Sequence, residues 1–416
     1  MTKQTLKTKT VVFIETNFSG LYAIEYCRNQ QYNTVLITDS YERFKKWFPD
    51  SALCKLDLVN QIIKVSDSND VTEVLNVIRN QIGDVDAVVT FAEIRTKTTA
   101  MLCRELGLKG SNVEAIELAQ NKYQFRQTLR DKGVEAVESL QFNPSDMALL
   151  DESTIPFPCF IKPVQGHSSI GAAVCYSMAD IRRTMDLLAK TAEDCISSSV
   201  VIEEYLIGNL LSVEILTTSA GQHQIVGISD RDIIQQSIEI GASFPLRHPF
   251  QDAIEKKACA ALDAIGYDFG ASHVELIMTK NGPYLVEVNT RVGGSGHSVM
   301  LDLATARSIV GDCIELSLGQ LQVATTLYNH VQGAAWKCFV YPSGGLIKAR
   351  PTLASIKEQA GVTDVWFHHD VGDEVGQLNS NFHWVAQVMC TGKEQLDAKN
   401  NAHAAIDFIA ANTIIG

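Results

Sequence analysis

The chain is 416 residues long, with a formal net charge of −13 at pH 7, 46 % hydrophobic residues and 20 % charged residues. This length exceeds what one hydrophobic core usually supports, so two or more packed domains are expected. The composition is that of a folded globular protein and excludes collagen-like and disordered classes. The negative charge, without a dense lysine or arginine cluster, argues against nucleic acid as a partner.

The N-terminal residues 1–10 are polar and lead into a short apolar stretch, residues 11–15, that is too short for a signal peptide or a membrane span. The ten cysteines are scattered, with no C-x-x-C pair and no zinc-ligand spacing. We therefore expect a cytoplasmic protein with reduced cysteines and no membrane partner. The sequence leaves the oligomeric state open, and a homodimer is the commonest state of soluble enzymes.

Apolar runs alternate with helical stretches over the first 112 residues. The runs lie at residues 11–14, 34–37, 62–65 and 87–91, and a helix at 96–106 closes the unit. This spacing predicts a doubly wound, Rossmann-like parallel sheet over residues 1–112. A helical pattern over residues 113–132 ends at Gly133, a favourable residue just past a helix end, and predicts one long connector helix.

The rest of the chain mixes strands and helices without a βα repeat. Residues 113–210 comprise the connector and a small α+β unit, with strands expected after residue 157, at 172–176 and at 200–204, and a helix at 179–189. Residues 211–332 are expected to form a larger α+β unit, with strands at 211–217, 224–229, 271–278 and 284–289 around a helix at 252–265. A third α+β unit is expected at 333–416. The predicted fold class is therefore a multidomain mixture of α/β and α+β.

A buried strand that ends in Lys162 precedes a loop of small residues. The loop contains Gly166, Ser168, Ser169 and Gly171. Its backbone N–H groups can approach a phosphate closely because little side chain intervenes, and the lysine adds a point charge. The lysine precedes the loop and no G-x-x-x-x-G-K-[ST] motif occurs, so a P-loop site is disfavoured. Taken alone, the segment is equally compatible with a tight turn.

Two apolar strands, each with one glutamate, flank a turn at residues 281–282. Positions equidistant from such a turn face one another, so Glu275 and Glu287 are expected nearly opposite on adjacent strands. Asn289 lies two residues after Glu287 and therefore on the same strand face. The three side chains offer the oxygen ligands that suit Mg²⁺. Arg291 continues this face, just before a Gly-Gly-Ser-Gly loop, and is placed to meet an anion.

Together these segments resemble the ATP-grasp superfamily. The resemblance rests on Lys122, Lys162 with its glycine loop, Glu203-Glu204-Tyr205-Leu206, Glu275 and Glu287-Val-Asn289-Thr-Arg291, in that order along the chain. Among the branches, the chain is most similar to the L-amino-acid ligases that make dipeptides, with biotin-carboxylase-like enzymes as more distant kin. The resemblance implies an ATP-grasp architecture, with an N-terminal parallel-sheet domain, a small lid subdomain and a larger C-terminal α+β domain.

The resemblance also implies residue roles. Lys122 and Lys162 would reach the phosphates of ATP, and residues 166–171 would close over them as a lid. Glu203 and the backbone of Glu204, Tyr205 and Leu206 would hold the adenine. Glu275, Glu287 and Asn289 would bind one or two Mg²⁺ ions, with Mn²⁺ as an alternative. Catalysis would rest on Lys162, Glu287 and Arg291, and the substrate would be contacted by Glu239, Arg291, Gly293, Gly294 and Ser295.

Two positions depart from the family pattern. Leu210 stands where an acidic residue usually contacts the ribose, and Ala242 stands where a histidine often lies near the substrate. His167 and His297 lie within the two glycine-bearing loops and are candidates for phosphate or substrate contact. Most of the histidines, including His368-His369 and His403, have no partner at metal spacing.

The leading interpretation is an ATP-dependent carboxylate–amine ligase that joins amino acids through an acyl-phosphate and releases ADP and phosphate. Charge neutralisation and positioning would supply most of the acceleration. The alternatives are a carboxylase of the biotin-dependent or purine-pathway type, and a nucleotide-binding module without turnover. The sequence does not disclose which amino acids are joined.

Overall fold

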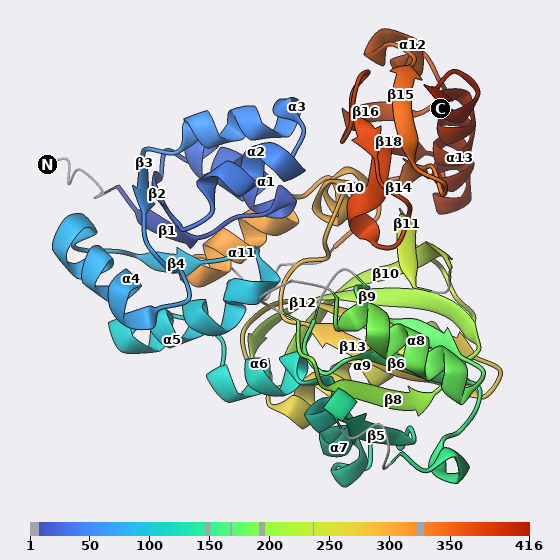
Figure 1. The fold of residues 1–416 in the computed structure, drawn as a ribbon. Coiled ribbons are helices and arrows are strands. Elements are labelled where there is room, and N and C mark those ends of the chain that lie inside the picture. Colours follow the sequence, from blue (N-terminus) through green and yellow to red (C-terminus); the bar gives the residue numbers. More distant parts are fainter. Residues whose placement is uncertain (1–7, 146–149, 167–168, 191–195, 236, 322–327) are drawn as a thin grey trace, which may run out of the picture.

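The computed structural model describes residues 8–145, 150–166, 169–190, 196–235, 237–321 and 328–416. Ser168 and His167, both named above as candidates, lie outside these ranges. In Figure 1 the N-terminal sheet lies to the left and the C-terminal strands lie at the upper right, with the remaining strands and helices below them. The chain therefore folds as several sheets that meet near its centre.

The N-terminal sheet is parallel, with strand order β3-β2-β1-β4. Its strands are β1 (Thr10–Ile14), β2 (Asn33–Thr38), β3 (Gln61–Lys64) and β4 (Ala87–Val89). The helices of this part are α1 (Phe18–Asn29), α2 (Tyr41–Trp47), α3 (Asp50–Leu53), α4 (Val71–Val77) and α5 (Thr96–Leu106). The apolar runs become strands of this sheet because both faces of a parallel sheet are covered by helices. The predicted parallel sheet is confirmed.

The expected single connector helix is wrong. The segment forms two helices, α6 (Val113–Gln120) and α7 (Lys122–Asp131). Asn121 ends the first with an extended backbone, and its side chain caps the second by accepting from the Gln124 N–H. Asparagine competes for backbone hydrogen bonds in this way and so favours helix starts over helix interiors. The break places Lys122 in the first turn of α7.

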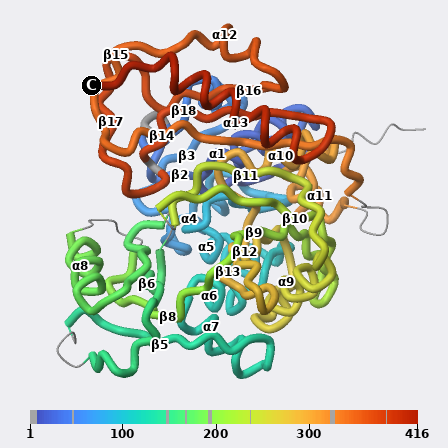
Figure 2. Tube along the Cα trace, turned by 90° about the vertical axis from the view of Figure 1, so that its right-hand side faces the viewer, coloured from blue at the N-terminus to red at the C-terminus, as the bar shows by residue number. Residues whose placement is uncertain are grey.

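The lid sheet has four antiparallel strands in the order β5-β8-β6-β7. They are β5 (Ser139–Phe142), β6 (Cys159–Pro163), β7 (Ala173–Cys175) and β8 (Val200–Glu204), and helix α8 (Met178–Leu188) packs against them. In Figure 2 this unit lies at the lower left, below the C-terminal part of the chain. The loop after Lys162 connects β6 to β7.

An eight-stranded sheet runs through the second half of the chain in the order β13-β12-β9-β10-β11-β14-β18-β16. Its first five strands are β9 (Gly208–Ser219), β10 (Gln222–Ile234), β11 (Ile238–Phe244), β12 (Gly270–Thr279) and β13 (Gly282–Asn289). Helix α9 (Gln251–Ile265) packs on this end of the sheet and ends at Gly266, whose φ of 72° suits a glycine. Strand β13 is an edge strand, so one side of its backbone faces no other strand.

The C-terminal part continues this sheet with β14 (Gly333–Val340), β18 (Trp384–Gly392) and β16 (Val362–Phe367). A second small sheet contains β15 (Gly345–Ala349), β17 (Glu374–Val375) and β19 (Ile414–Ile415), and helices α12 (Leu353–Lys357) and α13 (Gln395–Ala411) complete this part. The third and the fourth predicted units therefore share one long sheet. The boundaries of all four units stay a prediction.

Helices α10 (His297–Thr305) and α11 (Ile309–Ser317) follow the glycine loop after β13. Their buried residues Met300 and Val310 belong to the same hydrophobic cluster as Phe13 of β1 and Trp336 of β14. The core is thus continuous from the N-terminal sheet to the C-terminal strands, with the loop between them. Among the helices that the structure describes, none has the length and apolar character to cross a bilayer.

Candidate active site

The two glutamates of the hairpin face one another. Glu275 of β12 is the register partner of Glu287 of β13. Nearer the turn, Leu276 pairs with Leu285, so a β-bulge at Val286 shifts the register by one residue. Without it, Glu287 would lie opposite Val274. The predicted pairing of the glutamates is confirmed, and the bulge brings the two residues directly opposite one another.

Side chains from α7 and the lid sheet hold the bulged edge of β13. Arg126 donates to the Leu285 carbonyl at 2.7 Å, and the carboxylate of Glu135 accepts from the Leu285 N–H at 3.0 Å. Lys162 Nζ lies 3.3 Å from the Val286 carbonyl. These groups occupy the backbone positions that a further strand would otherwise fill, so the edge strand is fixed by charged side chains.

A cleft with an empty volume of about 1020 Å³ lies between the lid sheet and the end of the long sheet. Most of the residues predicted for the nucleotide and the metal line it: Lys122, Lys162, Gly166, Ser169, Glu203, Glu204, Tyr205, Leu206, Glu275 and Glu287. Leu210, the residue at the expected ribose position, lines it as well. The structure therefore brings together residues that lie as far as 165 positions apart, whereas their individual roles stay predictions.

Glu203 joins two cations at the wall of the cleft. Its carboxylate accepts from Lys162 Nζ at 2.6 Å and from Arg126 Nε at 2.8 Å, and all three side chains are almost fully buried. Burial alone would raise the pKa of Glu203, but Arg126 and Lys162 lower it to about 2. Burial lowers the pKa of Lys162, and the pairing with Glu203 offsets that effect only in part. Phosphate oxygens beside Lys162 would favour its charged form.

Lys122 and Ser169 position the loop between β6 and β7. Lys122 donates from its backbone to the Val164 carbonyl at 3.0 Å and from Nζ to the Gly166 carbonyl at 3.0 Å. Its Nζ is also 3.6 Å from Glu287. Ser169, with a φ of 60°, donates to the Ser237 carbonyl at 2.6 Å on the opposite side of the cleft. Gly171 has a φ of 71° at the base of this loop and does not line the cleft.

A second hollow adjoins the cleft at Lys122, Gly166 and Glu287. Its lining includes Asn289 and Glu93, the latter from the N-terminal part just after β4. Asn289 Nδ2 donates to Glu287 at 3.1 Å, which keeps the two side chains on one face. Arg291, predicted to meet an anion, forms an ion pair with Glu93 and donates to the Val292 carbonyl at 2.9 Å.

Arg291 does not line either of these two cavities, and neither do the other predicted substrate residues. Gly293 packs against His273 and His297, since a Cβ there would lie 2.8 Å from atoms of both rings. The Gly294 carbonyl accepts from His297 Nδ1 at 3.0 Å, and Ser295 has a φ of 56°. Glu239 of β11 is bound to Arg231 at 2.6 Å. Ala242 is buried in the core.

Sequence reasoning missed a buried charge network behind Glu275. Arg231 of β10 lies 2.6 Å from Glu239, 3.3 Å from Glu275 and 2.6 Å from His273 Nε2. His273 Nδ1 lies 2.7 Å from Glu214 of β9. Burial would raise the pKa of Glu275, but Arg231 and His273 lower it to about 2, so this carboxylate stays ionised. The network thus presents an anion to the cleft.

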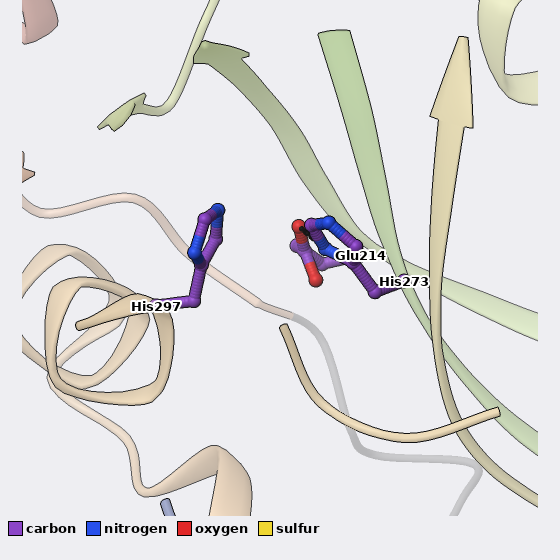
Figure 3. Close-up of side chains that lie close together, drawn as sticks. All are labelled: Glu214, His273 and His297. Carbon is purple, nitrogen blue, oxygen red and sulfur yellow. Dashed lines mark hydrogen bonds and ion pairs between the residues drawn. The ribbon is translucent and has the colours of Figure 1, made fainter. Parts of the chain in front are cut away.

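A sequence signal for this network did exist. Ser212 and Glu214 alternate with apolar residues in β9, as His273 and Glu275 do in β12 and Glu287 and Asn289 in β13. Alternation of this kind places all of these side chains on one face of the sheet. The sequence did not connect His273 to its partners, because they lie on neighbouring strands that sequence spacing does not relate (Figure 3). Asp230 and Asp232 are part of β10.

Comparison with known families identifies two regions of the chain. The ATP-grasp domain family matches residues 155–299, and L-amino acid ligase C-terminal domain 2 matches residues 337–413. The first range contains the lid loop and the β12–β13 hairpin. The second lies within the C-terminal strands and α13.

Curated relatives share part of the chain. The D-alanine–D-alanine ligase of Trichlorobacter lovleyi is 26 % identical over 202 residues, which is 47 % of this chain and 63 % of that protein. Dapdiamide A synthase of Enterobacter agglomerans is 22 % identical over 273 residues, 61 % of this chain and 62 % of that protein. The chain thus spans less than two thirds of the length of these relatives.

Solved structures show the same fold over nearly the whole length. An L-amino acid ligase from Bacillus licheniformis has a TM-score of 0.82 at 18 % identity and covers 99 % of this chain and 100 % of that one. The biotin carboxylase domain of the Hydrogenobacter thermophilus 2-oxoglutarate carboxylase, solved with MgADP, has a TM-score of 0.72 at 16 % identity and covers 98 % and 90 %.

The chain therefore contains an ATP-grasp domain and a region that matches L-amino acid ligase C-terminal domain 2, and its overall fold is the ATP-grasp fold. The resemblance and the fold class inferred from the sequence are both confirmed. The relatives named above include carbon–nitrogen ligases.

Proposed function

We propose that this protein is an ATP-dependent carboxylate–amine ligase that joins amino acids through an acyl-phosphate, releasing ADP and phosphate. The observation that carries the proposal is the pairing of Glu275 with Glu287 in a cleft that also contains Lys122 and Lys162. Two facing carboxylates beside two lysines can form a site for a divalent cation and a polyphosphate.

The donor set fits Mg²⁺. Glu275, Glu287 and Asn289 each offer a side-chain oxygen ligand, and the hydrogen bond from Asn289 Nδ2 to Glu287, at 3.1 Å, holds these two side chains together. Hard oxygen ligands that leave room for water and phosphate are the usual Mg²⁺ environment, and Mn²⁺ accepts similar ligands. When bound, the metal would neutralise the charge that develops during phosphoryl transfer.

The chain's own residues provide the rest of the chemistry. Lys162 and Lys122 would contact the phosphates, and Glu203 together with Arg126 would hold Lys162 in place. Because both Glu203 oxygens are engaged in ion pairs, we assign the adenine contact to the backbone of Glu204 to Leu206. The loop at 166–171 would exclude water from the acyl-phosphate, which hydrolysis would otherwise consume.

The hollow next to the cleft suits an amino acid. Glu93 lines this hollow and pairs with Arg291, and a zwitterion could exchange with that pair, its carboxylate meeting the guanidinium and its ammonium meeting the carboxylate. The carboxylate that attacks the γ-phosphorus would then lie near Glu287, where the two cavities meet. A second amino acid would supply the amine that displaces phosphate.

Two features support the amino-acid ligase over the carboxylase. The C-terminal match is to L-amino acid ligase C-terminal domain 2, and the TM-score to an L-amino acid ligase is 0.82 against 0.72 for the biotin carboxylase domain.

The nine cysteines in the described ranges are free, which fits the reducing cytoplasm that we propose as the location of the protein. A homodimer stays the proposed assembly.

The test is a substrate screen with purified protein, ATP and Mg²⁺. Mixtures of amino acids should release ADP and phosphate, and hydroxylamine should trap the activated carboxylate as a hydroxamate. Mass spectrometry then identifies the dipeptide. ADP release that depends on bicarbonate and not on amino acids would instead identify a carboxylase. Nucleotide binding without any turnover would identify the non-catalytic module and refute the proposal.

A further inference from the structure

Arg95 is a buried arginine at the carboxyl edge of the N-terminal sheet. The residue is 4 % exposed. Its Nη2 donates to Asp39 at 2.9 Å, and its Nε donates to Ser68 at 2.7 Å. Asp39 follows β2 and Ser68 follows β3, whereas Arg95 follows β4. The guanidinium therefore connects segments that follow three different strands, at the edge where doubly wound sheets usually hold a ligand.

The partner of this arginine, Asp39, is itself held in place. Its carboxylate also accepts from the backbone N–H and the hydroxyl of Ser68, at 2.8 and 2.7 Å. Its own backbone N–H donates to Glu15 at 2.6 Å, and Glu15 accepts from Thr38 at 2.8 Å. Burial alone would raise the pKa of Asp39, but hydrogen bonds from neighbouring serines and the charge of Arg95 lower it. Arg95 is therefore paired with an ionised carboxylate in a fixed position.

The short helical turn that Arg95 ends also carries Glu93. This turn spans Glu93–Arg95, and α5 begins at the next residue, Thr96. The Glu93 carbonyl accepts from Thr96 Oγ1 at 2.9 Å and from Gln120 Nε2 at 3.2 Å. Gln120 ends α6 and lines the same hollow as Glu93. The backbone of Glu93 is thus held from the edge of the N-terminal sheet and from α6.

The side chain of Glu93 extends from this turn to Arg291, which follows β13, and forms an ion pair with it. The two side chains are 24 % and 15 % exposed, so a small molecule can reach the pair, whereas Arg95 is shielded. Recognition of an ammonium group by Glu93 depends on where the turn holds the carboxylate. Misplacing a substrate-binding group by about 1 Å can cost about 100-fold in rate.

We propose that Arg95 is a positioning residue for the amino acid substrate. Its ion pair with Asp39 holds the turn so that the Glu93 carboxylate meets the substrate ammonium opposite Arg291, and Arg95 itself does not touch the substrate. This inference rests on the ligase function proposed above, because it assigns the ammonium contact to Glu93. It adds that the carboxyl edge of the N-terminal sheet supports the neighbouring hollow and is occupied by the chain's own guanidinium.

A purely structural role for Arg95 predicts a different result. Loss of a buried ion pair lowers stability wherever the pair lies. The kinetic constants of the folded enzyme change selectively only if the pair also positions a group that binds substrate. The two roles are therefore separated by comparing the apparent KM for amino acids with the KM for ATP in the same variant.

Steady-state kinetics of the full-length protein test the proposal. ADP release is measured while the total concentration of an equimolar mixture of the twenty proteinogenic L-amino acids is varied. Arg95→Met should raise the apparent KM for this mixture about 10-fold or more and leave the KM for ATP within about twofold. Thr34→Val is the matched control, since it removes a buried hydrogen bond to Asn60, 3.0 Å long, at the opposite end of β2. It should lower the temperature of unfolding without changing either KM.

A double-variant cycle shows whether Arg95 acts through Glu93. Glu93→Gln should raise the apparent KM for the amino acid mixture by itself. Arg95→Met added to Glu93→Gln should then cause little further change, because the carboxylate that Arg95 positions is already absent. Two independent effects would multiply instead.

The outcomes separate this inference from the ligase function. Amino-acid-dependent ADP release by the wild type, with an unchanged KM in Arg95→Met or with multiplying effects in the double variant, would overturn the positioning role and leave the ligase function standing. A wild type without amino-acid-dependent ADP release would refute the ligase function and this inference with it. If Arg95→Met does not fold, as judged by circular dichroism, the isosteric Asp39→Asn takes its place in the same cycle, with the same expected results.

Discussion

The nucleotide cleft and the loop after β13 differ in how their predicted residues lie. In the cleft, ten predicted residues line one cavity, and most of them come from strands or their ends. In the loop, Gly293 and Gly294 instead pack against His273 and His297. A strand fixes the direction of each side chain by its alternation, whereas a loop does not. Sequence patterns therefore locate catalytic groups on strands more securely than substrate contacts on loops.

The largest effect is expected at the β12–β13 pair. Glu287→Gln removes one charge from the two facing carboxylates and should lower kcat by about 1,000-fold or more, since charge stabilisation of the transferring phosphoryl group depends on the metal. The neutral isostere should leave the fold intact. The measurement is ADP release under saturating ATP and amino acids, with circular dichroism as a check. Glu358→Gln, exposed just after α12, is the matched control and should retain full activity.

Unimpaired turnover in Glu287→Gln would show that the cleft is not the reaction site. In that case the predicted roles of the cleft residues would be wrong as well, and the contrast between the cleft and the loop would no longer hold.

Arg126 should carry the next largest effect, on stability. It pairs with Glu203 and Glu135 in full burial and holds the Leu285 carbonyl at the bulge. Arg126→Met would leave two buried carboxylates with fewer partners and should lower the free energy of unfolding by about 3 kcal/mol or more. Urea unfolding measures this change. Arg130→Met, on the next turn of the same helix and exposed, is the control and should cost less.

A loss of stability in Arg126→Met no larger than in Arg130→Met would contradict the role assigned to the buried ion pairs. The bulge would then be held by the strand pairing of β12 and β13 alone.

Local sequence patterns predict much of the fold, but they do not predict the bulge. The apolar runs predicted the parallel sheet and the β12–β13 hairpin, because period and turn chemistry are local. The one-residue shift at Val286 was not predictable, since it is stabilised by Arg126, Glu135 and Lys162 from distant segments. The capping Asn121 was a local signal for two helices, but the continuous apolar pattern masked it.

The candidate site shows the same division. Lys162, Glu275 and Glu287 were recognisable because each interrupts or ends an apolar strand. The partners of Arg231, Glu214 and Glu93 lie on other strands or near another sheet, far away in the sequence. A single sequence does not show that these residues are in contact. Long-range pairing of polar side chains is therefore the part of the site that needed coordinates.

Lys162 should show an intermediate effect that separates binding from structure. Lys162→Met removes the cation facing the cleft but leaves Glu203 paired with Arg126. We expect kcat/KM for ATP to fall about 10- to 100-fold, which corresponds to about 1.4 to 2.7 kcal/mol of lost transition-state stabilisation. Calorimetric titration with ADP measures the share that is lost in binding. Lys280→Met, at the exposed hairpin turn, should change neither value. Unchanged kinetics in Lys162→Met would mean that the lysine has a structural role in the cleft wall and does not contact ATP during turnover.

The smallest effect contrasts the two faces of β10. Arg231 points towards Glu275, whereas Asp232 pairs with Lys337 at 2.8 Å and Lys399 at 2.8 Å on the side of the C-terminal helix. Burial alone would raise the pKa of Asp232, but the two lysines lower it to about 2 from an ordinary 3.8. The folded state thus binds this proton more weakly than the unfolded state, so the pairing stabilises the fold above about pH 4 and loses its effect as the pH falls towards 2.

Asp232→Asn should therefore lower the free energy of unfolding at pH 7 by about 1 kcal/mol, a modest value because the pair is partly exposed. The difference from wild type should shrink as the pH falls below 4, where the wild-type carboxylate begins to take up its proton. Urea unfolding at pH 7, 4 and 3 measures it, with Asp407→Asn on the exposed face of α13 as the control. A difference that stays constant with pH would mean that Asp232 acts through its shape and hydrogen bonds, and that the charge on this outer face, unlike that around Arg231, contributes nothing.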